Sequence, residues 1–158
     1  MNSLNLLKKT KHLRVFNFVL LLLSNICCQA EEVITSIAFG SCLKETRTQP
    51  IWESVIDSKP DVFVLLGDNI YGDTRDMDKL REKWKRFGAI EGFQKLRSNS
   101  RLLAIWDDHD YGENDAGAEY PAKFESQKIF LDFLNEPEDS KRRKSPGIYD
   151  CLTLGPEG

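Results

Sequence analysis

The sequence predicts an α/β fold in which one parallel sheet is flanked by helices. Short apolar segments of strand length alternate with amphipathic segments of helix length along residues 34–154. This alternation is typical of βαβ units with right-handed crossovers. The segment at 61–66 is apolar on both faces, as a parallel strand covered by helices requires. The 158 residues are enough for one domain and too few for two.

Four strands are expected, at residues 34–39, 61–66, 101–106 and 148–154. The first is a short buried strand that Gly40 ends, and the second follows Pro60. The fourth begins close to the end of the sequence. With helices between the strands, the expected order of elements is β-α-β-α-β-α-β.

The expected helices cover residues 49–57, 76–87, 92–97 and 122–134. Pro50 falls in the first turn of the first helix, where a missing N–H costs least. Asp76 and Asp78 lie at the start of the second helix, where negative charge favours the helix dipole, and Asp73 is expected to cap this helix. The basic run KRRK at 141–144 is expected to belong to a solvated loop.

The charge balance argues against nucleic acid as a stable partner. The chain holds 22 basic and 25 acidic side chains, and the first 30 residues contain four of the basic ones and no acid. The remaining chain is therefore clearly acidic, whereas a phosphate-binding face normally makes a domain basic. Hydrophobic residues make up 41%, which is typical of a folded globular domain and not of a disordered chain.

Residues 1–30 have the features of an export signal. Basic residues precede an apolar core at 15–26, and Cys28 and Ala30 supply the small side chains that cleavage after Ala30 needs. The apolar core is about a dozen residues long, while a membrane-spanning helix needs ~20. We therefore expect a removed signal peptide and a secreted or lumenal protein. The alternative is an uncleaved anchor, which would make this segment the contact with a membrane.

Cleavage after Ala30 would leave two cysteines, Cys42 and Cys151, in the mature chain. Two cysteines in an oxidising compartment favour a disulfide. Cys42 also lies directly after the first predicted strand, at a position suited to a metal ligand. Disulfide pairing and metal binding by Cys42 both stay open at this point.

Polar clusters follow each of the first three predicted strands. They are GSC at 40–42, GDNIYGD at 67–73 and DDHDYGEND at 107–115. The carboxyl ends of parallel strands lie on one edge of an open α/β sheet, and that edge carries the site. The three clusters are therefore expected to meet in space. Each cluster taken alone is also explained by ordinary turn chemistry.

The clusters together predict a metal site. Carboxylates packed together repel one another unless cations neutralise them, and Asp68, at the end of the central strand, is the best candidate to bridge two cations. Two metals ~3.5–4 Å apart clamp a phosphoryl oxygen and activate a water. A thiolate and a phenolate favour a ferric or softer ion, whereas oxygen ligands alone favour Ca²⁺, Mg²⁺ or Mn²⁺. The cluster at 107–115 does not fit the EF-hand calcium loop.

Three motifs resemble, in order and spacing, those of the PhoD-like (alkaline phosphatase D) metallophosphatases: FGSC at 39–42, GDNIY at 67–71 and WDDHDYGEND at 106–115. The resemblance covers roughly residues 34–154 and implies hydrolysis of phosphate monoesters or diesters at a centre of iron and calcium. It also implies a role for each matching residue. The iron ligands would be Cys42, Asp68 and Tyr71, with Asp68 bridging. The second metal would lie beside Asp108 and Asn114. His109 would stabilise or protonate the leaving oxygen.

Members of this family continue well beyond the length of this chain, into a second sheet and a late Gly-Asp-Val-His-type motif that supplies further ligands. The resemblance therefore implies that residues 31–158 form a partial metallophosphatase domain, with the second half of a four-layer α/β/β/α sandwich missing. Little or no turnover is expected from such a chain. Two alternatives remain: a non-catalytic truncated remnant, and a secreted calcium-binding structural protein.

Overall fold

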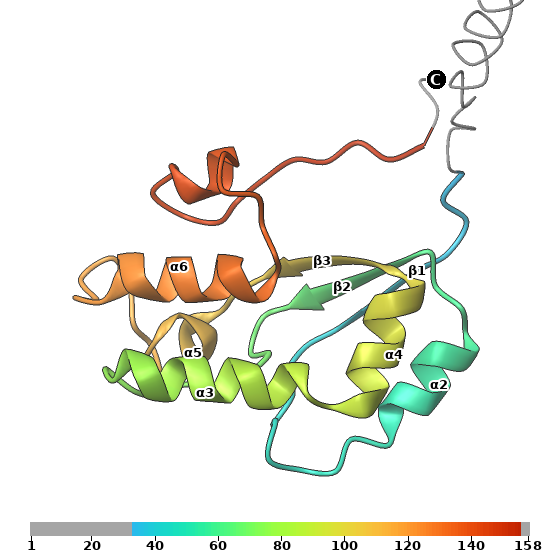
Figure 1. The fold of residues 1–158 in the computed structure, drawn as a ribbon, viewed down its shortest axis with the longest axis horizontal. Coiled ribbons are helices and arrows are strands. Elements are labelled where there is room, and N and C mark those ends of the chain that lie inside the picture. The colour runs from blue at the N-terminus through green and yellow to red at the C-terminus, as the bar shows by residue number, and fades with distance from the viewer. Residues whose placement is uncertain (1–32, 156–158) are drawn as a thin grey trace, which may run out of the picture. The chain divides into compact units, whose positions relative to one another are not determined.

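Three parallel strands form the sheet, in the order β1 (Ile37–Gly40), β2 (Val62–Leu66) and β3 (Arg101–Ile105) (Figure 1). Ile37 pairs with Val62, and Val62 pairs with Arg101. The computed structural model describes residues 33–155, so the expected signal segment at 1–30 lies outside the described residues. Within them, the predicted α/β fold with a parallel sheet and flanking helices is confirmed.

The first strand begins three residues later than predicted because the chain before it is held by a side chain. The backbone N–H groups of Thr35 and Ser36 donate to Asp61 Oδ2 at 2.7 and 2.9 Å. These two N–H groups therefore donate to a carboxylate and not to a carbonyl of the neighbouring strand. This contact ties the start of β1 to the residue that precedes β2, and so fixes the register of the two strands.

Helices connect the strands close to the predicted positions. They are α2 (Ile51–Asp57), α3 (Met77–Gly88), α4 (Glu91–Asn99) and α6 (Lys123–Phe133). α3 begins at Asp76, whose side chain accepts hydrogen bonds from the N–H groups of Asp78 and Lys79. The expectation that Asp73 caps α3 is therefore wrong. None of the helices within 33–155 is both long and apolar enough to cross a bilayer.

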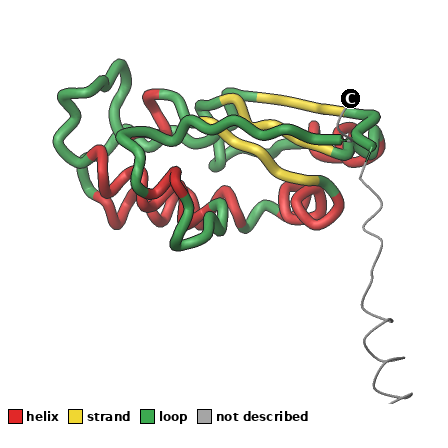
Figure 2. The backbone as a smooth tube through the Cα atoms, turned by 90° about the horizontal axis from the view of Figure 1, so that it is seen from above, coloured by secondary structure: helices red, strands yellow, loops and turns green. Residues whose placement is uncertain are grey.

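The helices bury one face of the sheet, and Figure 2 shows the helical layer to one side of the strands. Phe63 and Leu65 of β2 are 3% and 0% exposed. They belong to a core that also contains buried aromatic residues of α2, α3, α4 and α6, namely Trp52, Trp84, Phe87, Phe93 and Phe130. Burying each large apolar side chain stabilises the fold by ~1.5–3 kcal/mol, so this layer holds the sheet in place.

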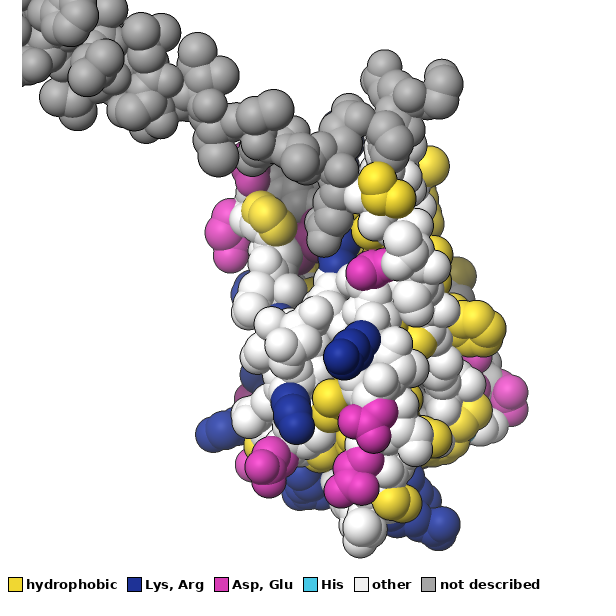
Figure 3. Space-filling view, turned by 90° about the vertical axis from the view of Figure 1, so that its right-hand side faces the viewer, with side chains coloured by type: hydrophobic (Ala, Val, Ile, Leu, Met, Phe, Trp, Pro, Cys, Tyr) yellow, Lys and Arg dark blue, Asp and Glu magenta, His cyan; other side chains and the backbone are white. Residues whose placement is uncertain are grey.

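The other face of the sheet exposes apolar side chains. Ile37 and Phe39 of β1 are 58% and 69% exposed, and Leu66 and Ile105 on the neighbouring strands are 45% and 37% exposed. Figure 3 shows apolar side chains gathered along one flank of the molecule. The expectation that the first strand is buried is therefore wrong, because β1 is an edge strand with helices over only one of its faces.

The segment after α6 also differs from expectation. No described residue of the predicted fourth strand at 148–154 is in a strand, although Ile148 is buried in the core. The basic run is also not a solvated loop, since it forms the 3-10 helix η1 (Lys141–Arg143). Arg142 pairs with Glu136 at 3.0 Å and donates to the carbonyl oxygens of Ile148 and Ala104. The Arg142 guanidinium therefore donates to the carbonyl of Ala104 in β3, which would otherwise be available to the N–H of a further strand.

Candidate metal centre

The three polar clusters meet at the carboxyl edge of the sheet, as the sequence predicts. The backbone N–H of Leu43 donates to the carbonyl of Asp68 at 2.8 Å, which joins the turns after β1 and β2. The N–H of Gly72 donates to the carbonyl of His109 at 3.0 Å, which joins the turns after β2 and β3. Backbone hydrogen bonds between the turns therefore set the positions of the side chains that the clusters carry.

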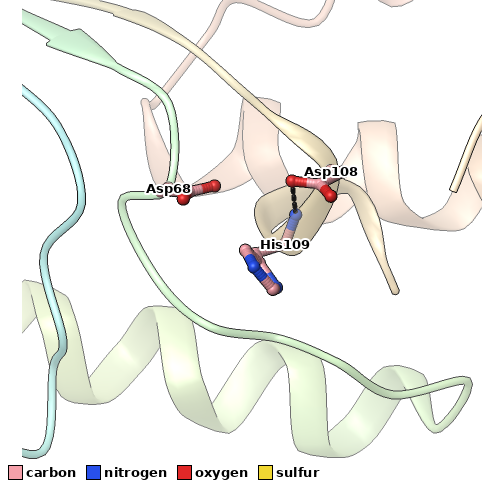
Figure 4. Close-up of side chains that lie close together, drawn as sticks. All are labelled: Asp68, Asp108 and His109. Carbon is pink, nitrogen blue, oxygen red and sulfur yellow. Dashed lines mark hydrogen bonds between the residues drawn. The ribbon is translucent and has the colours of Figure 1, made fainter. Parts of the chain in front are cut away.

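Asp68, Asp108 and His109 form the centre of this edge. One ligand atom from each lies within 4.8 Å of the others, and all three residues are half-buried. Figure 4 shows the two carboxylates and the imidazole turned toward a common space, with Asp68 coming from the turn after β2 and the other two from the segment after β3. Residues about 40 positions apart in the sequence thus present three metal-type ligands together.

Asp68 is held in an unusual backbone conformation. Its φ is +49°, and Gly67 before it has a φ of +101°. A Cβ at Gly67 would lie 2.7 Å from the Cβ of Asp107, so only glycine lets the two turns approach this closely. Asp68 Oδ1 is buried and has no hydrogen-bond partner among residues 33–155. A carboxylate oxygen without a donor is costly unless a cation neutralises it.

Asp108 is held as an ionised carboxylate. The backbone N–H of Asp115 donates to its Oδ2 at 2.5 Å and that of His109 donates to its Oδ1 at 2.9 Å. The hydrogen bond from Asp115, supported by the N–H and the charge of His109, lowers the pKa of Asp108 although partial burial opposes the shift. The carboxylate is therefore oriented and charged before any ligand arrives.

Cys42 and Tyr71 also lie beside Asp68, and Tyr71 lies between Cys42 and His109 in contact with the His109 ring. Cys42 is exposed, and its Sγ lies 3.8 Å from Asp68 Oδ2. Both Cys42 and Cys151 are free thiols, so the structure does not form the disulfide that the sequence left open. Burial, together with the charges of Asp68 and Cys42, raises the pKa of Tyr71. Asp68 is thus the residue common to the Cys42 side and the Asp108 side of the site.

His109 is the imidazole of the centre. Its Nδ1 lies 2.6 Å from Asp73 Oδ1, and its ring packs on Tyr71 with the centroids 4.5 Å apart. Burial alone would lower the pKa of His109, but the hydrogen bond and charge of Asp73, with the charges of Asp108 and Asp68, raise it above its usual value. The sequence did not indicate Asp73 as a partner of His109.

Asn114 is placed at the margin of the site. It is exposed, and among the described residues its side-chain amide donates to Asp115 Oδ2 at 2.6 Å. Its neighbour Asp115 bonds to Asp108 through the backbone. The structure therefore brings together Cys42, Asp68, Tyr71, Asp108 and His109, and leaves Asn114 one residue away from a direct contact with them.

The acidic run after β3 contains a short helix, α5 (Asp108–Tyr111), that was not predicted. Asp107 is its N-cap, and the Asp110 side chain accepts from the backbone N–H of Asp107, which completes a capping box. The spacing Asp-x-x-Asp at 107–110 is the signal that identifies such a helix start. Two of the acidic residues in this run therefore build the local structure, which leaves Asp108 and His109 facing the site.

Asp110 is also the residue that joins α5 to the turn after β2. It is fully buried and accepts hydrogen bonds from the backbone N–H groups of Asn69 and Ile70 and from the Asn69 side chain. Burial raises the pKa of Asp110 to about 7 although these N–H donors oppose the shift. This role could not be predicted from the sequence, because the partners of Asp110 lie about 40 positions away.

No family model, curated protein or solved structure matches this chain. The resemblance of the three motifs to PhoD-like metallophosphatases therefore stays a prediction from the sequence.

Proposed function

We propose that this chain belongs to a metal-dependent phosphoric ester hydrolase of the PhoD-like type. The observation that carries the proposal is the meeting of Asp68, Asp108 and His109 within 4.8 Å, with one buried oxygen of Asp68 lacking a hydrogen-bond partner within residues 33–155. The same residues stand at the positions of the metal ligands and of the histidine in the family motifs.

The donor set fits a pair of cations. Cys42, Asp68 and Tyr71 would hold iron, while Asp68 and Asp108 would hold calcium. Asn114, the further calcium ligand that the motif implies, lies at the margin and bonds to Asp115. Asp68 is suited to be shared because its Oδ2 faces the Cys42 thiol and its Oδ1 lacks a hydrogen-bond donor among the described residues. Burial raises the pKa of Tyr71 further above neutral pH, so a cation would be needed to stabilise its phenolate. When bound, such cations neutralise phosphate oxygens and activate water.

The protein residues contribute position and a proton. Asp68 and Asp108 supply the negative charge that would hold the cations, and the cations would in turn hold the phosphate. His109 has a raised pKa and its Nδ1 is bonded to Asp73. Its Nε2 is therefore the ring nitrogen available to donate a proton to the leaving oxygen, and the proton transfer needs no other side chain of the described site.

The exposed face of the sheet supports a larger metallophosphatase architecture. Ile37 and Phe39 are more than half exposed on a face that carries no helix, and a soluble protein rarely leaves such a face uncovered. We propose that this unit is the first half of an α/β/β/α sandwich, with a second sheet against this face.

Metal binding by the full chain tests the ligand assignment. Mn²⁺, Ca²⁺ and Fe³⁺ are offered separately, and bound metal is measured after equilibrium dialysis. Asp68→Asn removes one charge from the shared ligand and should lower the affinity by more than the ~10–100-fold typical of losing an outer-shell partner. Asp78→Asn is the matched control, since Asp78 is exposed and pairs with Arg81 on α3. Equal metal binding by wild type and Asp68→Asn would overturn the assignment.

Hydrolysis of nitrophenyl phosphate and of an alkyl phosphate tests the role of His109. In a protein in which this chain is completed by the second half of the sandwich, His109→Ala should keep bound metal and lower turnover of the alkyl ester by ~10²–10⁴-fold, the usual contribution of a general acid. The loss should be smaller for nitrophenyl phosphate, whose leaving group needs little protonation. A variant that loses its metal and slows both esters equally would contradict this role.

A further inference from the structure

We propose that Asp73 is a positioning residue: it accepts the Nδ1 proton of His109 and thereby fixes the ring with Nε2 as the nitrogen available to the centre. The inference deepens the proposed function and rests on it for the use made of Nε2. The orientation of the ring itself is argued from contacts in the protein alone.

Three consecutive residues surround His109, and we call Tyr71, Gly72 and Asp73 the His109 cradle. The Tyr71 ring packs on the imidazole with centroids 4.5 Å apart, and the N–H of Gly72 donates to the His109 carbonyl at 3.0 Å. Asp73 Oδ1 lies 2.6 Å from Nδ1. The cradle therefore contacts the face of the ring, the backbone and one ring nitrogen of a single residue.

The cradle has little freedom to adopt another position. A Cβ on Gly72 would lie 2.6 Å from the His109 carbonyl oxygen and 2.7 Å from Leu80 Cδ1, and Leu80 is fully buried in α3. The N–H of Thr74 then donates to the carbonyl of Gly112 at 2.8 Å. The residues before and after Asp73 are thus both bonded to the α5 segment, Gly72 to His109 and Thr74 to Gly112. Asp73 itself has a φ of +44°.

The chemistry of the pair assigns the tautomer. An ionised carboxylate only accepts hydrogen bonds, so the proton between the two residues belongs to Nδ1. The other groups that face the ring are Tyr71, Asp68 and Asp108, and the side chain of Asp108 bonds to the backbone N–H of His109. Asp73 is therefore the group that decides which nitrogen is free.

With Nδ1 bonded to Asp73, Nε2 is open toward the centre. It can then serve as a metal ligand when the ring is neutral, or as a proton donor when the ring is protonated. A histidine that binds metal through one nitrogen is usually oriented by a carboxylate on the other. A histidine that donates a proton to a leaving group is oriented in the same way. Asp73 makes the same contribution in both cases, and the role of His109 is a separate question that metal binding answers.

Asp73→Gly tests the proposal without backbone strain, because glycine readily adopts the φ of +44° that Asp73 has. Asp73→Asn keeps an acceptor oxygen and is the conservative rescue. Asn135→Gly is the control for glycine at a positive φ, since Asn135 has a φ of +58°, is exposed and lies outside the candidate centre. The readout is the ¹⁵N chemical shifts of the imidazole ring in the full chain, with His109→Gln to identify the signals.

At a pH above the pKa of His109, wild type and Asn135→Gly should show neutral His109 with its proton on Nδ1. Asp73→Gly should lower the Nδ1–H population by about tenfold or more relative to Nε2–H, as expected for loss of a hydrogen bond to a charged group. Asp73→Asn should restore most of the wild-type ratio. An unchanged tautomer in Asp73→Gly, or an equal change in Asn135→Gly, would overturn the proposal.

A second measurement separates this proposal from the function on which it rests. Mn²⁺ affinity is measured for the same variants by calorimetry. With the tautomer changed, a ~10–100-fold weaker affinity in Asp73→Gly supports positioning of a metal ligand, and an unchanged affinity supports positioning of a proton donor. If no variant binds Mn²⁺ while the tautomer still responds to Asp73→Gly, the metal centre fails and the positioning role stands.

Discussion

Asp110 Oδ2 accepts hydrogen bonds from both the backbone and the side-chain nitrogen of Asn69, at 3.1 and 2.9 Å. This relationship links α5, which carries Asp108 and His109, to the turn that carries Asp68. Asn69 also donates to the carbonyl of Ile105 at the end of β3. The two turns are therefore held by one buried polar network, and the distances within the candidate centre depend on it.

Asp110→Asn should destabilise the protein. The amide nitrogen would face N–H donors that the carboxylate now accepts, so at least one buried donor would lose its partner at a cost of about 1–3 kcal/mol. The expected result is a lower midpoint in urea unfolding. Asp115→Asn, an exposed change in the same acidic run, is the control, and an equal midpoint for both variants would contradict the role given to Asp110.

The exposed sheet face should make the isolated chain self-associate or remain loosely packed. Ile37 and Phe39 form the most exposed part of that face, and a large exposed apolar patch favours association. Replacing both by Gln should raise the monomer fraction in light scattering and lower the binding of a hydrophobic dye. Phe124→Gln is the control, since Phe124 is 64% exposed and belongs to α6, not to a strand of the sheet. A monodisperse wild-type monomer with a sharp cooperative melt would contradict the prediction.

Stability should fall in acid through Asp61. The backbone hydrogen bonds from Thr35 and Ser36, with that from the Thr35 hydroxyl, lower the pKa of Asp61 below 3.8. A carboxylate with a lowered pKa stabilises the folded state above its usual pKa, and this contribution is lost as the pH falls through the folded value. Asp61→Asn should therefore be less stable than wild type at neutral pH.

The difference between Asp61→Asn and wild type should disappear in urea unfolding once the pH is well below 3.8. Asp57→Asn is a suitable comparison because Asp57 is exposed at the end of α2. A stability difference for Asp61→Asn that stays constant from neutral to acid pH would show that its charge makes no contribution.

Export should remove residues 1–30. The basic residues, the apolar core and the small side chains at Cys28 and Ala30 predict cleavage after Ala30. N-terminal sequencing of the exported protein should therefore begin at Glu31. Ala30→Leu should block the cleavage, because the site requires a small residue there. An exported wild-type protein that retains its apolar core would instead indicate an anchor.

The sequence alone determined the α/β order, the three strands and the helices between them. These features depend on local periodicity, on caps and on residues that end helices, which are visible within about a dozen neighbouring residues. The sequence also predicted that Cys42, Asp68 and His109 would meet. Each lies in a cluster directly after a strand, which is a local feature, and the carboxyl ends of parallel strands lie at one edge of a sheet.

Only the tertiary structure decided which acidic residues face the site. Asp107 and Asp110 build α5, Asp73 bonds to His109, and Asp108 faces Asp68. The capping spacing of Asp107 and Asp110 is local. The hydrogen bonds of Asp110 to Asn69 and Ile70, and of Asp73 to His109, join residues 36 to 41 positions apart, and no local pattern shows them. The exposure of β1 and the irregular path of residues 149–154 have the same origin. Both depend on which elements pack against them in space, and that is a property of the whole fold.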